Sequence, residues 1–280
     1  MMAPMTAETY SSAVGAPHLA RSAANLAVTV LFAGFILGPL LVLALWSVAQ
    51  QWFWPSLLPS AFTTRWYEWA ITVPNVFRSL RTSLLVAALV TISTAVVAVP
   101  AAIAIGRFRF PGRDFLRTLF SLPLLVPYIS LGIGIASFFY AVRLNGSLAA
   151  VVLAHMIATF PFGVLIVASA VEELPPEVEE AALACGADRW TVFRKITLPQ
   201  LVPALLAQAG YVFMLSMDEF TLTLLVSNPD TATLPVQIYS AIGEGYLQIS
   251  SALAMLLLIP SVMLAYVIAR YLRADVVAAG

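Results

Sequence analysis

Six long apolar runs most strongly constrain how this 280-residue chain can fold. A hydrocarbon layer about 30 Å thick needs about 20 apolar residues in a helix, because every backbone polar group must be paired internally. The runs that meet this length are Leu26–Ala49, Leu84–Ile105, Thr118–Val142, Ser147–Val171, Pro203–Val226 and Ile249–Ala269. An apolar fraction of 61%, against roughly 45–50% in soluble domains, agrees with them. We therefore predict an all-α membrane protein with six transmembrane helices.

The first apolar run resembles a signal peptide at its end, where Ser47, Val48 and Ala49 are small residues suited to a cleavage site. The run is nevertheless longer than the roughly 7–15 residues of a signal peptide's apolar core. We interpret it as a retained transmembrane helix.

Basic residues set the expected orientation, because Lys and Arg resist translocation. With six spans and both termini inside, most of the 14 basic residues are cytoplasmic. Those inside are Arg21, Arg107, Arg109, Arg113, Arg117, Arg189, Arg194, Lys195, Arg270 and Arg273, and those outside are Arg65, Arg78, Arg81 and Arg143. The predicted layout is a cytoplasmic tail (1–25), a first transmembrane helix (26–49), an outer loop (50–77), a five-helix core (78–272) that includes the cytoplasmic loop 172–199, and a C-terminal tail (273–280).

Prolines interrupt several of the predicted spans. They are Pro100, Pro123, Pro127, Pro161 and Pro260. Each removes a backbone donor and kinks its helix, which a membrane tolerates where neighbouring helices or a water-lined cavity satisfy the freed carbonyl. The two interpretations are broken helices along a transport pathway and ordinary bundle packing.

The remaining composition argues against several classes of function. The formal net charge is zero, so no charge excess predicts a nucleic-acid partner. The single cysteine, Cys185, excludes an intrachain disulfide, and with two histidines and no ligand spacing we predict no metal site. We expect His155 to be a hydrogen-bonded core residue. An intramembrane enzyme would need a motif such as HExxH or GxSxG, which the sequence lacks, so we predict no catalytic residue.

Charged residues are concentrated between the fourth and fifth spans, where the segment Glu172–Pro199 holds nine of the 28 charged residues of the chain, 14 acidic and 14 basic. Pro176 suits the first position of a helix, and Glu177, Glu179 and Glu180 then place negative charge at the positive end of its dipole. We therefore predict a short helix that begins near Pro176 and lies outside the lipid.

This short helix is predicted to turn at a glycine into a second one. Its small side chains recur at spacings of three and four, at Val178, Ala181, Ala182 and Cys185. Gly186 can adopt the left-handed conformation that ends a helix, Asp188 can cap the next helix, and Pro199 is expected to close it. The narrow stripe suits a groove on another protein; the alternative is a solvated connector.

The spacing within this loop resembles a known motif. Glu180-Ala181-Ala182, three residues, Gly186, nine residues and Ile196-Thr197-Leu198-Pro199 match EAA-x3-G-x9-I-x-L-P, the EAA motif of permease subunits of ATP-binding cassette importers. The order of spans and the segments Thr159–Phe162, Ser216–Phe220 and Thr233–Pro235 are similar to the spermidine/putrescine-type permeases. The resemblance runs from about Phe77 to the last span. One departure is Cys185, where the family often has leucine.

The resemblance implies the type I importer permease fold in a bacterial inner membrane, with a coupling helix around Glu177–Ala187 that docks on an ATPase. The implied coupling residues are Glu180, Ala181, Ala182, Gly186, Ile196, Leu198 and Pro199. The implied partners are an ATP-binding cassette ATPase dimer, a second permease subunit, either a copy or a paralogue, and a periplasmic or lipid-anchored solute-binding protein. Lys195 is the only lysine and follows no Gly-rich loop, so we expect ATP to be bound by the partner and no cofactor by this chain.

Two acids within the fifth span, Asp218 and Glu219, need an explanation, because a charge at depth costs roughly 2.5–3.5 kcal/mol on insertion scales. One interpretation places them along the solute pathway, where they attract a cation. The other gives them a structural role, either capping a broken helix or pairing with Arg78 or Arg81.

The solute is the least determined part of the prediction. The resemblance implies a polyamine, and the alternatives are aminoethylphosphonate, ferric iron or another small solute carried by the same class of importer. An ion-coupled transporter or channel is the competing class, and it would leave the motif unexplained.

Overall fold

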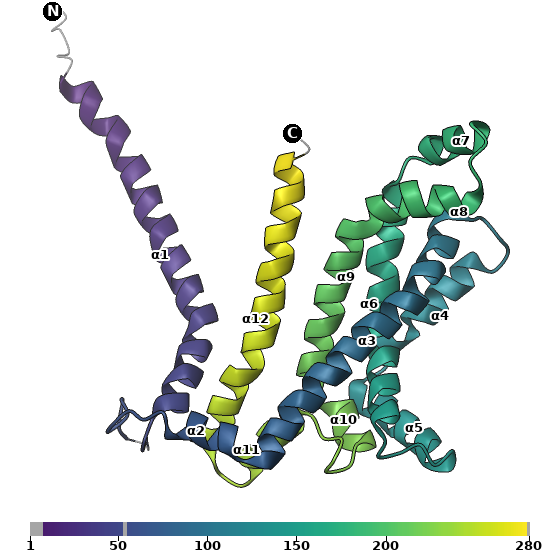
Figure 1. The fold of residues 1–280 in the computed structure, drawn as a ribbon. Coiled ribbons are helices and arrows are strands. Elements are labelled where there is room, and N and C mark those ends of the chain that lie inside the picture. The colour runs from purple at the N-terminus through teal and green to yellow at the C-terminus, as the bar shows by residue number, and fades with distance from the viewer. Residues whose placement is uncertain (1–7, 53–54, 279–280) are drawn as a thin grey trace, which may run out of the picture.

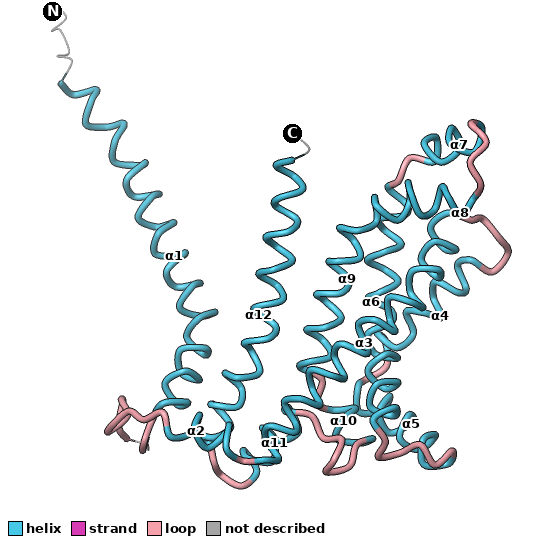
Figure 2. Tube along the Cα trace, viewed as in Figure 1, coloured by secondary structure: helices cyan, strands magenta, loops and turns pink. Residues whose placement is uncertain are grey.

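The computed structural model describes residues 8–52 and 55–278, in which the secondary structure is helical apart from one isolated bridge between Ala49 and Phe62. The helices are α1 (Glu8–Val48), α2 (Arg65–Thr72), α3 (Pro74–Arg107), α4 (Arg113–Leu125), α5 (Tyr128–Ala141), α6 (Leu148–Glu173), α7 (Pro176–Ala184), α8 (Arg189–Val192), the π-helical turn η1 (Phe193–Thr197), α9 (Leu198–Asp218), α10 (Thr221–Val226), α11 (Leu234–Gly243) and α12 (Leu247–Ala278). Figure 2 shows that most loops gather at the two ends of the bundle.

We name the two ends of the molecule after the short helices found there. Helices α7 and α8 lie at one end, the α7 end, together with the start of α1 and the end of α12 (Figure 1). Helices α2, α10 and α11 lie at the opposite end, the α2 end (Figure 1). The segment predicted as a tail over residues 1–25 is helical from Glu8 onward, residues 1–7 lie outside the described residues, and α12 continues to Ala278.

Helices α3, α6 and α9 pack on one another to form the core of the fold. Gly163 of α6 lies close to α3, because an added Cβ there would meet Thr94 at 2.8 Å and Ala98 at 3.3 Å. Fully buried valines and alanines, including Val90 and Ala154, fill the space between these helices. Small residues let the backbones approach closely, which is how helices associate in hydrocarbon.

Within residues 8–52 and 55–278, five single helices are long and apolar enough to cross a membrane, and a bent pair brings the number to six. The single helices include Pro74–Arg107 and Leu148–Glu173, longer than the predicted runs at these positions. This agrees with the predicted all-α fold with six spans, with two exceptions.

The third predicted span, Thr118–Val142, is wrong as a single helix. It is divided into α4 and α5, whose axes differ by 103°. The break lies at Val126 and Pro127, where Val126 adopts an extended conformation (φ −92°, ψ 130°). A proline disfavours the helical conformation of the residue before it and cannot donate to the ladder, so Pro127 ends α4. In contrast, Pro100, Pro161 and Pro260 lie inside continuous helices.

The fifth predicted span, Pro203–Val226, is also wrong at its end. Helix α9 stops at Asp218, Glu219 is extended (φ −69°, ψ 122°), and the short helix α10 follows. The two acids therefore lie at a helix break rather than within a continuous span.

Candidate functional site

Helix α7 begins and ends as its sequence predicts. Pro176 occupies the first turn, and Glu177 and Glu179 lie beside it at the positive end of the helix dipole. Gly186 has φ +89°, its N–H donates to Leu183 O at 3.0 Å, and the N–H of Ala187 donates to Ala182 O at 3.1 Å. This pair of bonds is a Schellman motif, which ends a helix on a left-handed residue.

Asp188 caps the next helix, also as predicted. Its Oδ2 accepts hydrogen bonds from the N–H groups of Trp190 (3.0 Å) and Thr191 (3.1 Å), and its Oδ1 accepts one from the Thr191 hydroxyl. These bonds, the Thr191 hydroxyl foremost, favour the ionised form and lower the pKa of Asp188. The charged cap fixes the direction in which the chain leaves the glycine corner.

The second helix does not close at Pro199, and that prediction is wrong. Helix α8 runs through η1 into α9, so Pro199 lies in the first turn of α9. In η1 the N–H of Leu198 donates to Phe193 O, one residue farther back than in an α-helix. A π-helical turn widens the ladder locally, and Pro199 follows it at a position where a missing N–H costs little. The corner is therefore joined rigidly to a membrane-spanning helix.

Glu179 attaches α7 to the core, a role that the sequence analysis missed. Its Oε1 accepts hydrogen bonds from Arg107 Nη2 at 2.9 Å and from the Thr197 hydroxyl at 2.8 Å. Arg107 also donates through Nη1 to Leu174 O at 2.7 Å. Both Arg107 and Glu179 are partly buried, with side-chain exposures of 16% and 25%. One carboxylate thus links the ends of α3, α7 and η1.

A second set of contacts fixes the start of the loop. Glu172 Oε1 lies 3.0 Å from Arg117 Nη2 and 3.3 Å from Arg113 Nη2, both on α4. Arg113 also donates to Ile105 O at 2.6 Å. A cavity of about 310 Å³ lies between the loop and the core, with Arg107 and Glu179 in its wall.

The outer face of the loop is exposed and partly apolar. We call Val178 and Trp190, which are 44% and 65% exposed, the exposed loop face, whereas Leu183, 41% exposed, lines the cavity between the loop and the core. Among the predicted coupling residues, Glu180, Ala181, Gly186 and Pro199 are exposed, and Ala182, Ile196 and Leu198 are partly buried. The motif therefore contributes both to the surface of the loop and to its attachment.

Glu219 caps α10 at the break after α9. Its Oε1 accepts from the N–H of Leu222 at 2.7 Å, and its Oε2 accepts from the N–H of Thr223 at 3.0 Å. His155 of α6 is fully buried, as expected of a core histidine, and its Nε2 lies 3.2 Å from Glu219 Oε2 and 2.7 Å from Thr223 Oγ1. Its Nδ1 lies 2.8 Å from Ser216 Oγ. The carboxylate of Glu219 is thus enclosed by donors.

Asp218, in contrast, is exposed. It ends a stripe of exposed positions along one face of α9, at spacings of three and four residues: Pro203, Ala207, Tyr211, Met214 and Asp218. The opposite face carries buried residues such as Leu201 and Val212. The structure therefore separates two acids that are adjacent in the sequence.

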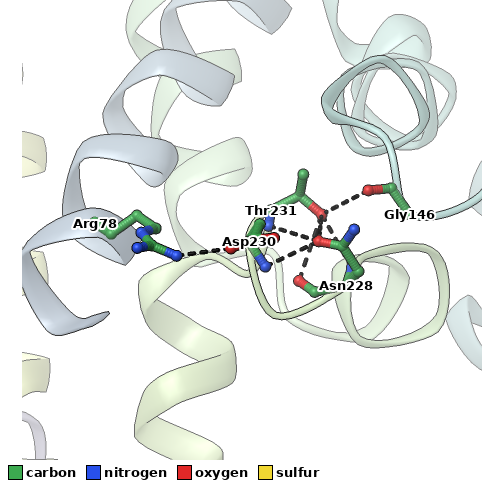
Figure 3. Close-up of polar contacts among 5 residues, drawn as sticks. All are labelled: Arg78, Gly146, Asn228, Asp230 and Thr231. Atoms are coloured by element: carbon green, nitrogen blue, oxygen red, sulfur yellow. Dashed lines mark hydrogen bonds and ion pairs between the residues drawn. The ribbon is translucent and has the colours of Figure 1, made fainter. Parts of the chain in front are cut away.

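Arg78 does not pair with either of these acids. Its Nη1 lies 2.7 Å from Asp230 Oδ1, in the loop between α10 and α11 (Figure 3). Asn228 Oδ1 accepts from the N–H groups of Asp230 and Thr231, and the Thr231 hydroxyl donates to Gly146 O at 3.1 Å (Figure 3). These contacts connect the loop to α3 and to the start of α6 at the α2 end.

Comparison with protein families identifies the fold and the general role. Residues 98–277 match the family described as "Binding-protein-dependent transport system inner membrane component". The match covers more than half of the chain and includes the α7 loop and the break after α9.

Curated relatives extend the likeness toward the N-terminus. The chain is 30% identical over 246 residues to a putative 2-aminoethylphosphonate transport system permease protein, PhnV, of Salmonella typhimurium, covering 87% of this chain and 92% of PhnV. It is 29% identical to the putrescine transport system permease protein PotI of Escherichia coli, covering 85% and 86%, and 29% identical to the spermidine/putrescine permease PotC, covering 72% and 77%.

Solved structures share the fold at lower identity. A chain of a bacterial ATP-binding cassette transporter for the acidic polysaccharide alginate superposes with a TM-score of 0.70 at 15% identity, covering 96% of this chain and 99% of that one. A chain of the MetNI methionine transporter, in an inward-facing conformation, gives a TM-score of 0.61 at 20% identity, covering 71% and 94%.

Proposed function

This chain belongs to the family of binding-protein-dependent transport system inner membrane components. From that premise we propose that its α7 loop docks on a separate ATPase, which powers solute import. The chain is a permease subunit of a bacterial ATP-binding cassette importer in the inner membrane. The observation that carries the proposal is an exposed apolar face, formed by Val178 on α7 and Trp190 on α8, in a loop that Glu179 holds against the core.

The proposed orientation rests on the basic residues of the α7 end. The α7 end carries Arg107, Arg109, Arg113, Arg117, Arg189, Arg194 and Lys195 in its loops and helix ends. Lys and Arg concentrate on the cytoplasmic side of membrane proteins, so we place the α7 end in the cytoplasm, together with both termini. The α2 end then faces the solute-binding protein outside.

Force from the ATPase would reach the membrane through two connections. The covalent one runs from the glycine corner through η1 into α9, so a displaced α7 pulls directly on a spanning helix. The other is Glu179, which bonds to Arg107 at the end of α3. Closure of an ATPase dimer on ATP would thereby move α3 and α9 together and switch the pathway between inward-open and outward-open. The second half of the pathway would come from another permease subunit, and ATP would be bound by the ATPase.

Association with an ATPase subunit tests the docking. We expect an ATPase encoded with the chain to co-purify with it, and Gly186→Arg, which places a large side chain on a φ of +89°, to abolish both association and uptake. A matched control is Gly134→Ala in α5, where an added Cβ meets nothing within 4 Å. Uptake that persists without ATP would favour an ion-coupled transporter or channel instead.

For the solute, we propose a polyamine such as putrescine or spermidine. Relatives named for putrescine and for 2-aminoethylphosphonate share one chemical group, a primary ammonium on a short alkyl chain. Exposed Asp218, at the end of the α9 stripe with Tyr211, offers a carboxylate and an aromatic ring to such a group. We assign Glu219 to the helix break, because its oxygens already accept three hydrogen bonds.

A thermal-shift screen of the partner binding protein with putrescine, spermidine, 2-aminoethylphosphonate and ferric iron would identify the solute. In proteoliposomes of the full importer, we expect Asp218→Asn to raise the KM for a cationic solute about tenfold while ATP hydrolysis is retained. Glu68→Gln, an exposed acid on α2 bonded to Thr64, is the control. Unchanged KM in Asp218→Asn with intact assembly would remove Asp218 from the pathway.

A further inference from the structure

A second cavity lies at the α2 end and belongs to neither site described above. It has a volume of about 340 Å³ and is bounded by α2, the start of α3, α11 and the start of α12. These elements lie together at the foot of the molecule in Figure 1. Its floor consists of Val76, Ala241, Ile249 and Leu253, which belong to one buried apolar cluster. Small-molecule sites span roughly 300–1,000 Å³, so this cavity suits a small solute or a headgroup.

The rim of this cavity carries one charge and two aromatic rings. Of the residues that the structure describes, Glu244 is the only charged one that lines it, beside Trp69, Tyr246, Gln237 and Ser240. Among the described residues, the Glu244 carboxylate has no ion pair and no side-chain hydrogen bond. No basic residue from the described part of the chain lines the cavity, so no side chain there would neutralise an anion. The rim is therefore suited to a cation.

Glu244 also occupies an electrostatically unfavourable place. It is the C-cap of the ten-residue helix α11, where the unpaired carbonyls make the helix end negative. A carboxylate there is repelled, whereas a cation is favoured by both the carboxylate and the helix end. The local fold supplies no compensating positive group among the described residues. A bound cation would supply it.

A glycine turn fixes the two sides of the rim. Gly245 has φ +84°, its N–H donates to Ile242 O at 3.0 Å, and the N–H of Tyr246 donates to Ala241 O at 2.9 Å. This Schellman motif sets Glu244 and Tyr246 on either side of Gly245. Trp69 approaches from α2, so two aromatic residues and one carboxylate line a single cavity.

We propose that this cavity is a binding site for a primary ammonium group on a short alkyl chain. The ammonium pairs with Glu244 and lies against Trp69 and Tyr246, as cations do on aromatic faces. The methylenes contact Val76, Ile249 and Leu253. The site is separate from the proposed pathway residue Asp218 and does not depend on which solute is imported; only its placement on the outer side rests on the proposed orientation.

Two sources share this chemistry, a soluble amine and the headgroup of phosphatidylethanolamine. The headgroup carries a phosphate a few ångströms from its ammonium, and the cavity offers no basic side chain to that phosphate. We therefore assign the site to a soluble amine.

The test uses the full chain co-purified with its partner subunits, without the binding protein, in nanodiscs of phosphatidylcholine and phosphatidylglycerol. Putrescine is titrated and its binding followed by saturation-transfer NMR, with 1,4-butanediol as the uncharged analogue. Every sample carries Asp218→Asn, so that the proposed pathway acid does not contribute. We expect Glu244→Gln to weaken putrescine binding at least tenfold, Glu68→Gln to leave it within twofold, and the diol not to bind.

Basal ATP hydrolysis, which should be unchanged in Glu244→Gln, reports that the complex is intact. Equal putrescine binding in Glu244→Gln and Glu68→Gln would overturn the site while leaving the importer assignment untouched. In a further arm, phosphatidylethanolamine replaces phosphatidylcholine. Unchanged putrescine affinity supports a soluble amine, and a tenfold loss through competition would overturn that source.

Discussion

Arg107 Nη2 and Glu179 Oε1 lie 2.9 Å apart, although 72 residues separate these residues in the sequence. The contact joins the last residue of α3 to the middle of α7, and the Thr197 hydroxyl bonds to the same carboxylate oxygen at 2.8 Å. An exposed ion pair contributes little, but this one is partly buried and shares its acceptor with a buried threonine. It therefore fixes the position of α7 relative to the spanning helices.

Glu179→Ala should loosen α7 without unfolding the chain. The change leaves Arg107 and Thr197 without their shared acceptor, at a cost of about 1–3 kcal/mol. We expect uptake in proteoliposomes to fall at least fivefold while ATPase association is largely retained, because the exposed loop face remains. The control is Glu177→Ala on the same helix, an exposed acid without a contact of this kind among the described residues. Equal uptake in the two variants would contradict a coupling role for Glu179.

Trp190→Ala, in contrast to Glu179→Ala, should weaken association with the ATPase. Trp190 is 65% exposed, so its removal should change the free energy of unfolding by no more than about 0.5 kcal/mol. Exposed tryptophans are frequent hot spots when a partner covers them, worth about 2 kcal/mol or more, which corresponds to a roughly 30-fold loss of affinity. We expect a weaker pull-down of the ATPase with an unchanged melting temperature. Undiminished binding would place the docking surface elsewhere.

Substitutions of Gly186 should lower uptake according to how poorly the new residue tolerates a left-handed backbone conformation. An added Cβ meets nothing within 4 Å, so the cost of a substitution is the left-handed φ of +89°, about 1–2 kcal/mol for an ordinary residue. Asn tolerates this conformation better than Ala, and Val worse. We therefore expect uptake to fall in the order Gly, Asn, Ala, Val. A series ordered by side-chain volume instead would indicate contact with the partner.

The sequence predicted features that depend on neighbours in the chain. Pro176, Gly186 and Asp188 act through backbone geometry and bonds within a few residues, so the start, end and cap of the loop helices were predicted correctly. Hydrophobic length predicted the spans, because hydrocarbon thickness acts on each run separately.

The wrong and missing predictions concern choices that depend on surroundings. Pro127 breaks a span whereas Pro100 and Pro161 do not, and residue type alone does not distinguish them. Pro199 was predicted to end a helix because proline usually breaks one. The π-helical turn before it, which lets the helix continue, leaves no pattern in the apolar residues. Glu179 differs from its neighbouring acids only through Arg107, which is distant in sequence. Arg107 closely follows the uncharged run Leu84–Ile105, and that position was the only signal available in the sequence.

The buried His155 and the exposed Asp218 should respond differently to substitution. His155→Ala removes a neighbour of the Glu219 carboxylate and leaves Ser216 and Thr223 without their shared partner, which should cost about 1–3 kcal/mol. We expect a lower melting temperature of the purified complex. Asp218→Asn should leave the melting temperature nearly unchanged, because the residue is exposed. A stable His155→Ala variant would show that the Glu219 cap does not depend on His155.

The cap at Asp188 should make the glycine corner sensitive to acid. Hydrogen bonds from Thr191 and the neighbouring amides lower the pKa of Asp188 in the folded state below its unfolded value of about 4. A lowered folded pKa contributes stability that is present above the unfolded pKa and is lost as the pH falls through the folded pKa. The amides of Trp190 and Thr191, which the carboxylate accepts from, should therefore lose protection from hydrogen exchange below about pH 4. Asp188→Asn is the control, because it keeps an acceptor but has no charge to lose. Dividing the exchange rates of the two proteins cancels the intrinsic pH dependence of exchange. This ratio should change only in that acidic range. A ratio that stays constant from pH 7 to pH 3 would mean that the ionised carboxylate does not hold the corner.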